Sequence, residues 1–65
     1  MKLTVNGEAL DLDSGNLDDL LKKLEYEGEW LATAVNGDVV HREERSTHAL
    51  KEGDRIEILS PMQGG

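Results

Sequence analysis

The sequence predicts a two-layer α+β domain in which a mixed sheet of four to five strands packs on one helix. Three observations support this prediction. Apolar residues alternate with period two near both ends of the chain, and between these segments they recur at the spacing of one helical face. The chain has 65 residues, a size at which a single core forms and cannot be divided. We therefore expect one domain over residues 1–59 and a flexible tail over residues 60–65.

The first two strands are predicted to form a hairpin within residues 1–12. Alternating apolar residues flank an Asn-Gly pair there; they are Leu3, Val5, Leu10 and Leu12, and the pair is Asn6-Gly7. Asn-Gly is the strongest short hairpin signal, because both central residues of the favoured turn need positive φ. We assign the two Asn-Gly pairs of this chain to turn formation and to no other role.

The helix is predicted to begin after Asn16, where the apolar period changes from two to that of a helical face. The residues on this face are Leu17, Leu20, Leu21 and Leu24. Asn16 is a suitable N-cap, and the acidic residues Asp18 and Asp19 are favourable in the first turn. Gly28 is a natural C-terminal stop, so we expect about three helical turns.

After Gly28 the period of two returns in residues 31–35 and leads into a second pair, Asn36-Gly37. A short return strand through Val39 and Val40 should follow this turn. Residues 41–51 are polar and irregular, and they predict a long loop with one short turn. Its apolar anchors are Ala49 and Leu50.

Gly53-Asp54 is predicted to turn the chain into residues 55–59, the most strand-like segment of the sequence. Hairpins at both ends of the chain with a helix between them favour a mixed sheet whose first and last strands lie side by side and parallel. This is the β-grasp arrangement. Pro61 has no N–H and should end the last strand, leaving the tail to continue from the sheet.

The composition argues against several classes of function. Asp and Glu number 14 against 7 Lys and Arg, and this acidic excess repels nucleic-acid backbones. The sequence has no apolar run long enough to span a membrane and no signal-peptide core. It also contains no cysteine, so disulfides cannot stabilise it. We expect a cytoplasmic protein that binds neither nucleic acid nor membranes.

The body of the domain offers little catalytic chemistry. Ser46, His48 and Asp54 have the residue types of a hydrolase triad, but they lie in one polar stretch without a nucleophile elbow. His41 and His48, with two glutamates between them, match no metal-binding spacing. We therefore expect no catalytic residue, no metal site and no bound cofactor. The two aromatic residues, Tyr26 and Trp30, are expected to cover the core near the end of the helix.

The ending SPMQGG carries the clearest functional signal. Glycine has no β-carbon, so a Gly-Gly end can enter a narrow channel and present its carboxylate there. A free carboxylate is a poor acyl donor, but ATP can convert it to an acyl-adenylate. A sulfur or nitrogen nucleophile can then displace AMP, and the terminus becomes a carrier of an activated group. A chain without cysteine needs a partner enzyme for this chemistry.

The sequence resembles the ThiS-like sulfur carriers of thiamine biosynthesis, which share the β-grasp fold with ubiquitin and with the small subunit of molybdopterin synthase. The matching stretches cover nearly the whole chain; they are LTVNGE, NLDDLLKKL, ATAVNGDVV with Arg42-Glu43, and EGDRIEILSPMQGG. The last stretch is the most specific of the four. The resemblance implies a carrier that is a cosubstrate and not an enzyme.

The resemblance also implies the partners and the site. A ThiF-like activating enzyme of the ubiquitin-activation type would use ATP to adenylate Gly65, and a cysteine-desulfurase relay would supply sulfur to form a thiocarboxylate. A ThiG-like thiazole synthase would then receive the sulfur. Gly64, Gln63 and Met62 are expected in each partner's channel, and Leu59 on the docking face. A monomer suits this role best.

The chain departs from the family pattern in one segment. Many ThiS-like proteins have Val-Pro-Arg after the second hairpin and an aromatic residue soon after, whereas this chain has Val40-His41-Arg42 followed by no aromatic residue. The sulfur could therefore go to molybdopterin, cysteine, tRNA thiolation or another pathway. A ubiquitin-like modifier and an inert interaction module remain alternatives. We also expect Glu43, Glu44 and Asp54 to steer basic partners toward the acidic surface.

Overall fold

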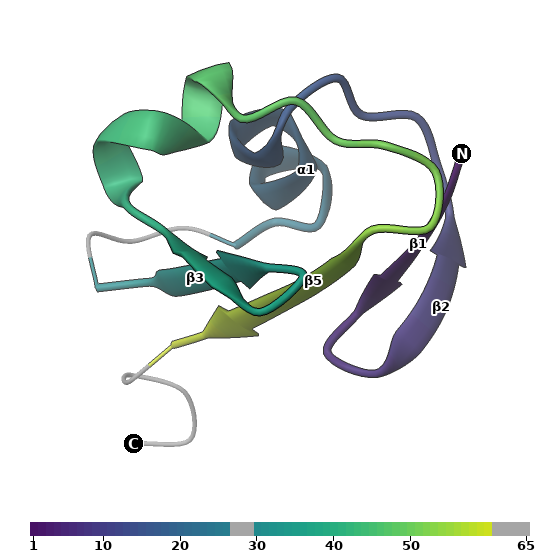
Figure 1. The fold of residues 1–65 in the computed structure, drawn as a ribbon, viewed down its shortest axis with the longest axis horizontal. Coiled ribbons are helices and arrows are strands. Elements are labelled where there is room, and N and C mark those ends of the chain that lie inside the picture. The colour runs from purple at the N-terminus through teal and green to yellow at the C-terminus, as the bar shows by residue number, and fades with distance from the viewer. Residues whose placement is uncertain (27–29, 61–65) are drawn as a thin grey trace.

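The computed structural model describes residues 1–26 and 30–60 (Figure 1). Within these residues the chain forms five strands, one α-helix and one 3₁₀ helix. In chain order they are β1 (Lys2–Val5), β2 (Glu8–Asp11), α1 (Leu17–Lys23), β3 (Ala32–Val35), β4 (Asp38–Val40), η1 (Arg42–Thr47) and β5 (Arg55–Leu59). The prediction of two strands, a helix and three further strands is confirmed.

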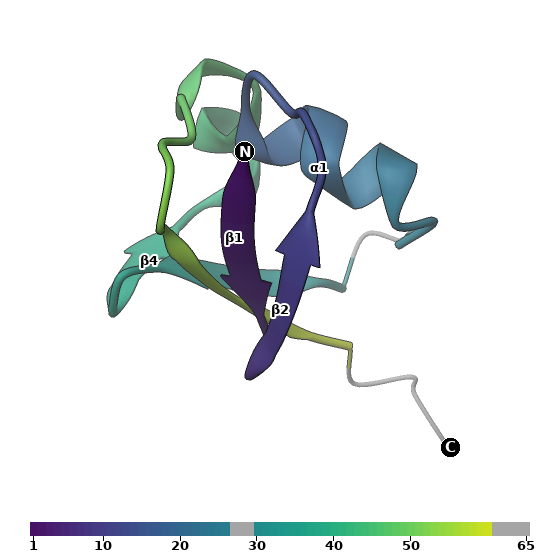
Figure 2. The same ribbon diagram turned by 90° about the vertical axis from the view of Figure 1, so that its right-hand side faces the viewer.

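The strands form one mixed sheet in the order β2-β1-β5-β3-β4. The last strand of the chain thus lies in the middle, parallel to β1 and antiparallel to β3. Both helices lie on the same side of the sheet, as Figure 2 shows. The predicted β-grasp arrangement is confirmed, including the side-by-side first and last strands.

The core lies between the sheet and α1. The buried apolar residues are Leu3, Val5, Leu17, Leu20, Leu21, Val35, Val40, Leu50, Ile56 and Ile58. Leu17 and Leu20 have no exposed surface, and burial of such a side chain contributes about 1.5–3 kcal/mol relative to an exposed one. The inward-facing apolar residues of the strands and the leucines on one face of α1 therefore form one core, as the sequence predicts.

The helix begins as predicted but ends earlier. The Asn16 side chain accepts a hydrogen bond from the Asp19 N–H at 2.8 Å, which confirms the N-cap. At the other end Glu25 has a φ of 63°, and the Tyr26 N–H donates to the Leu21 carbonyl at 2.9 Å. This hydrogen bond closes a Schellman-type turn around Glu25, so the helix has seven residues instead of about three turns. The predicted stop at Gly28 lies outside the described residues.

Both Asn-Gly pairs form the predicted hairpin turns. Their φ values are 51° at Asn6 and 82° at Gly7, and 52° at Asn36 and 86° at Gly37. Positive φ at both central positions is the signature of a type I′ turn, whose twist matches that of the flanking strands.

The polar segment 41–51 is more ordered than a long loop with one short turn, because it contains η1. Leu50 is buried as predicted, but Ala49 is exposed. Arg45 instead turns inward and is only 7 % exposed. Its guanidinium donates to the Thr33 hydroxyl at 3.1 Å and to the Leu31 carbonyl at 2.6 Å. Arg45 thus connects η1 to β3 and, with Leu50, anchors this segment, whereas the expected anchor Ala49 does not.

Candidate functional site

The end of β5 is the described strand end that is closest in sequence to the predicted reactive terminus. Ile56 and Ile58 point into the core, whereas Arg55, Glu57 and Leu59 alternate with them on the outer face of the sheet. Leu59 is 70 % exposed, as a docking residue must be. The remaining predicted site residues, Met62, Gln63, Gly64 and Gly65, lie outside the described residues.

Leu59 belongs to an apolar surface that we call the outer patch and define as Ala32, Ala34, Val39 and Leu59. These residues line a shallow hollow of about 260 Å³ on the outer face, together with Asn6, Thr33 and Glu57. The strand register brings them together, because Ala32 pairs with Leu59 and Ala34 pairs with Val39. Val39 is 68 % exposed. Exposed apolar surface beside polar residues is typical of a protein interaction site.

The sequence did not identify Val39 as a surface residue. Val39 and Val40 follow each other in β4, so only one of them can face the core. The structure buries Val40 and exposes Val39. The register between β3 and β4 determines which valine faces the core. This register cannot be read from the sequence before the strand pairing is known.

The expectation that both aromatic residues cover the core is wrong for Trp30. Tyr26 packs against the core, but Trp30 is 70 % exposed. Trp30 lies in a turn before the start of β3. The alternation that buries Thr33 and Val35 begins only with the strand. It therefore does not place the Trp30 side chain in the core.

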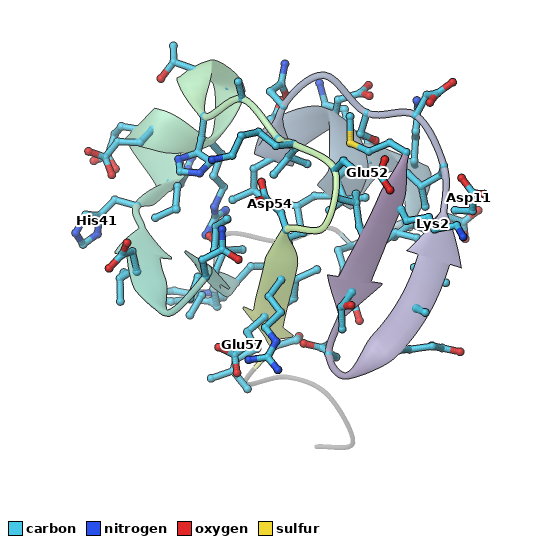
Figure 3. All side chains as sticks on the ribbon, turned by 45° about the vertical axis from the view of Figure 1, so that its right-hand side comes forward. Lys2, Asp11, His41, Glu52, Asp54 and Glu57 are labelled. Atoms are coloured by element: carbon cyan, nitrogen blue, oxygen red, sulfur yellow. The ribbon has the colours of Figure 1, made fainter. Side chains whose placement is uncertain are left out.

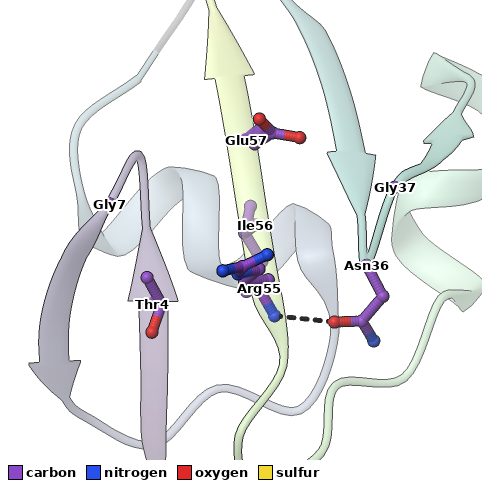
Figure 4. A pocket seen from close by; sticks show the side chains of 7 residues that line it. All are labelled: Thr4, Gly7, Asn36, Gly37, Arg55, Ile56 and Glu57. Carbon is purple, nitrogen blue, oxygen red and sulfur yellow. Dashed lines mark hydrogen bonds between the residues drawn. The ribbon is translucent and has the colours of Figure 1, made fainter.

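A second hollow, of about 630 Å³, lies between the two Asn-Gly hairpins (Figure 4). Its lining comes from both turns, from β1 and from β5; the residues are Thr4, Gly7, Asn36, Gly37, Arg55, Ile56 and Glu57. Glu57 lines both hollows. The outer face therefore has an apolar half beside the end of β5 and a polar half beside its beginning.

The asparagine side chains of the two turns also hold β5, so the assignment of these pairs to turn formation alone is wrong. Asn6 Oδ1 accepts the Ile58 N–H at 2.8 Å, and Asn36 Oδ1 accepts the Arg55 N–H at 2.9 Å. One turn thus contacts each end of the strand. The sequence signal for a hairpin gives no information about these long-range hydrogen bonds.

Asp54 is a buried residue and not a surface charge. Only 4 % of it is exposed, and its carboxylate accepts hydrogen bonds from the Lys51 N–H and from Asn36 Nδ2, both at 2.9 Å. Figure 3 shows it at the start of β5, with Glu57 further along the strand. Asp54 therefore cannot contribute to steering as predicted; Glu43 and Glu44 are exposed.

The pKa of Asp54 follows from opposing effects. Burial is the largest single effect and raises this pKa, whereas the hydrogen bonds from Asn36 and from the Lys51 N–H lower it. The charges of Lys51 and His48 act in the same direction as these hydrogen bonds. The pKa of Asp54 therefore lies below its ordinary value, and the carboxylate is ionised at neutral pH.

The geometry of the polar residues does not resemble a catalytic site. Ser46 is exposed on η1, while the Asp54 carboxylate already accepts hydrogen bonds from the Lys51 N–H and from Asn36. Glu44 accepts a hydrogen bond from the His41 N–H at 3.1 Å and thereby caps η1. Over residues 1–26 and 30–60, three or more potential metal ligands do not come together. The described helices are also too short or too polar to cross a membrane.

The strand order and the packing of α1 on the sheet define a small ubiquitin-like β-grasp domain with an exposed apolar patch beside the end of its last strand. Comparison with known families assigns it more closely. Residues 3–65 match the ThiS family, and the chain belongs to this family.

Solved structures and curated relatives agree with this assignment. The crystal structure of the thiamine biosynthesis protein ThiS from Geobacter metallireducens is 36 % identical, covers all of both chains and has a TM-score of 0.83. The sulfur carrier protein ThiS of Escherichia coli is 29 % identical over the whole of both chains.

A second kind of relative is larger. The RNA-binding protein KhpB of Streptococcus pneumoniae is 35 % identical over 92 % of this chain. The chain spans only 18 % of the length of that protein. The similarity is therefore to one segment of a longer chain.

Proposed function

We propose that this protein is a sulfur carrier that acts as a cosubstrate of other enzymes and is itself not an enzyme. The reactive atom is the terminal carboxyl carbon of Gly65. An activating partner transfers AMP from ATP to this carboxylate, and pyrophosphate leaves. The observation that supports the proposal most strongly is the match to the ThiS family up to residue 65, which includes the Gly-Gly end.

The sulfur step follows from the chemistry of the acyl-adenylate. A sulfur nucleophile attacks the acyl carbon, and AMP leaves with the bonding electrons. Where the nucleophile is a persulfide from a cysteine-desulfurase relay, a partner thiol then cleaves the S–S bond. The products are a thiocarboxylate on Gly65 and a disulfide on the partner.

We further propose that the thiocarboxylate supplies the sulfur of the thiazole ring of thiamine, with a ThiF-like activating enzyme and a ThiG-like synthase as partners. This proposal rests on the family and on its relatives in thiamine biosynthesis. ATP is used by the activating partner, and the carrier needs no cofactor of its own. Met62, Gln63 and Gly64 are proposed to lie in the partner's channel.

The outer patch is the proposed docking surface. Leu59 and Val39 are exposed apolar residues that line the same hollow, and Leu59 comes only six residues before Gly65 in the sequence. Burial of both side chains in an interface would contribute about 3–5 kcal/mol to association. Leu59→Asp should therefore weaken binding to the activating enzyme. Ala9→Asp is the matched control, because Ala9 is exposed on the edge strand β2 and pairs with Thr4.

The decisive experiment measures the intact mass after incubation with ATP, an activating enzyme and a sulfur donor. The mass should increase by the difference between one sulfur and one oxygen atom, and fragmentation should assign the increase to Gly65. Deletion of Gly65 should abolish it. Isopeptide conjugates on cellular proteins would indicate a modifier instead, and full biological activity without Gly65 would indicate an interaction module.

A further inference from the structure

The end of β5 is paired regularly on one side only. On the β3 side the ladder continues to the pair Ala32 and Leu59. On the other side β1 pairs with β5 only at Arg55 and Ile56, because β1 ends at Val5. The Asn6-Gly7 turn therefore lies beside β5 where a strand would otherwise continue.

Asn6 supplies hydrogen bonds along this second side. Its backbone N–H donates to the Ile56 carbonyl at 2.9 Å, and its side-chain Oδ1 accepts the Ile58 N–H at 2.8 Å. The carboxamide thus extends the pairing of β5 by one hydrogen bond beyond the end of β1. Its Nδ2 also donates to the Tyr26 hydroxyl at 3.4 Å, and Tyr26 packs against the core.

The turn alone does not require asparagine at this position. A φ of 51° is accessible to glycine at least as readily as to asparagine. Glycine, however, has no side-chain oxygen for the Ile58 N–H. A buried or half-buried N–H without an acceptor destabilises the fold. The specific contribution of Asn6 is therefore its contact with the last strand.

We propose that Asn6 is a positioning residue for the reactive terminus: its carboxamide holds Ile58 and so fixes where the chain continues from Leu59 toward Gly65. The inference rests on the proposed function, because only a terminus that reacts inside partner enzymes gains from a fixed starting point. Reaction requires the terminal carboxylate to meet the nucleotide in a narrow range of geometries. If the end of β5 is held less firmly, a smaller fraction of the carrier molecules bound to the partner has the carboxylate in a reactive geometry.

Three variants of the full chain test the proposal. Asn6→Gly keeps the turn and removes the acceptor, whereas Asn6→Asp keeps an oxygen for the Ile58 N–H. Asn36→Gly is the matched control, because Asn36 occupies the same position in the same type of turn. It contacts Arg55 at the opposite end of β5, far along the strand from the tail.

Two measurements are made on each variant. Amide hydrogen exchange at Ile58 reports the local hydrogen bond, and thiocarboxylate formation with ATP, activating enzyme and sulfur donor is measured as kcat and KM for the carrier. Loss of one hydrogen bond should accelerate Ile58 exchange and lower kcat about fivefold in Asn6→Gly. KM should change less than kcat, because the four apolar residues of the outer patch are unchanged and Asn6 contributes only one polar side chain to the hollow they line.

Asn6→Asp should restore both values, and Asn36→Gly should keep the wild-type kcat even though it destabilises the fold. A wild-type kcat in Asn6→Gly would overturn the proposal, as would equal losses of kcat in Asn6→Gly and Asn36→Gly. Failure of the wild-type chain to gain sulfur at Gly65 is a different result. It would refute the proposed function, and this inference would be refuted with it.

Discussion

Asp54 offers the sharpest test of how the fold is held together. The change Asp54→Ala removes a carboxylate that accepts two hydrogen bonds of 2.9 Å, one from the Lys51 N–H and one from Asn36. Hydrogen bonds to a charged group contribute about 1.5–3 kcal/mol each. Since the two bonds share one group, we expect the free energy of unfolding to fall by about 2–4 kcal/mol. A chain of this size has only about 3–10 kcal/mol in total.

Asp54→Asn removes the negative charge of the side chain and keeps its size and shape. The amide can accept only one of the two hydrogen bonds, and its NH₂ group faces a second donor. Asn36 cannot relieve this conflict by rotating its amide, because its Oδ1 already accepts the Arg55 N–H. We therefore expect Asp54→Asn to destabilise the fold by about 1–3 kcal/mol. Asp38→Asn, at an exposed position on β4, is the control and should change stability by less than about 0.5 kcal/mol.

The pKa of Asp54 determines how its contribution to stability changes with pH. The pKa of Asp54 is lower in the folded chain than its ordinary value of 3.8. Its contribution to stability is therefore fully present above that value and is lost as the pH falls through the folded pKa. The difference between wild type and Asp54→Asn should be constant from about pH 7 to about pH 5 and should shrink below about pH 4.

Urea unfolding followed by far-UV circular dichroism measures this difference. Trp30 is a poor probe, because it is already 70 % exposed in the folded chain. A difference between wild type and Asp54→Asn that stays constant down to about pH 2 would contradict the assignment to the ionised carboxylate. Equal stability of the two proteins at neutral pH would contradict the hydrogen-bond argument as well.

Asn16→Ala removes the cap of α1 and should lower the free energy of unfolding by about 1 kcal/mol, whereas Asn16→Asp should be close to wild type. Equal urea midpoints for the two variants would exclude a capping role. Arg45→Ala leaves two acceptors without their donor and should destabilise by about 2–3 kcal/mol, against less than about 0.5 kcal/mol for the exposed Arg42→Ala. A similar decrease in Tm for Arg45→Ala and Arg42→Ala would contradict the claim that the buried hydrogen bonds of Arg45 stabilise the fold. Leu20→Ala should create a core cavity and lower the unfolding free energy by about 2–5 kcal/mol, which calorimetry can check; a loss below about 1 kcal/mol would contradict the packing.

The sequence predicted those features that depend on local periodicity. Alternation and the Asn-Gly pairs indicated both hairpins, and the leucine spacing after Asn16 indicated the helix. The parallel pairing of the first and last strands also followed, because a mixed sheet with hairpins at both ends has few other topologies. These predictions succeed because local preference and core formation favour the same structure.

The features that depend on long-range contacts could not be predicted. Asp54 was grouped with the surface carboxylates, because its burial depends on Asn36 in another hairpin. Arg45 lies in a segment without periodicity, and no local rule indicates which of its polar residues turns inward. The helix stop was placed at Gly28, although Glu25 adopts the positive φ that glycine usually provides.

The burial of Arg45 gives a physical account of how a polar segment is held on the domain. Arg45 is buried, and its guanidinium donates to Leu31 and Thr33. The long side chain fills space beside the core, while its polar end satisfies backbone and hydroxyl acceptors.

The central place of β5 has a consequence for how the protein is made. During synthesis β1, β2, β3 and β4 emerge from the ribosome first, but the two hairpins share no ladder until β5 is inserted between them. The sheet can therefore close only once the strand that leads to the tail has been translated. A chain that ended within β5 would leave the inner edges of β1 and β3 without their partner, so we expect it to be much less stable than the full chain.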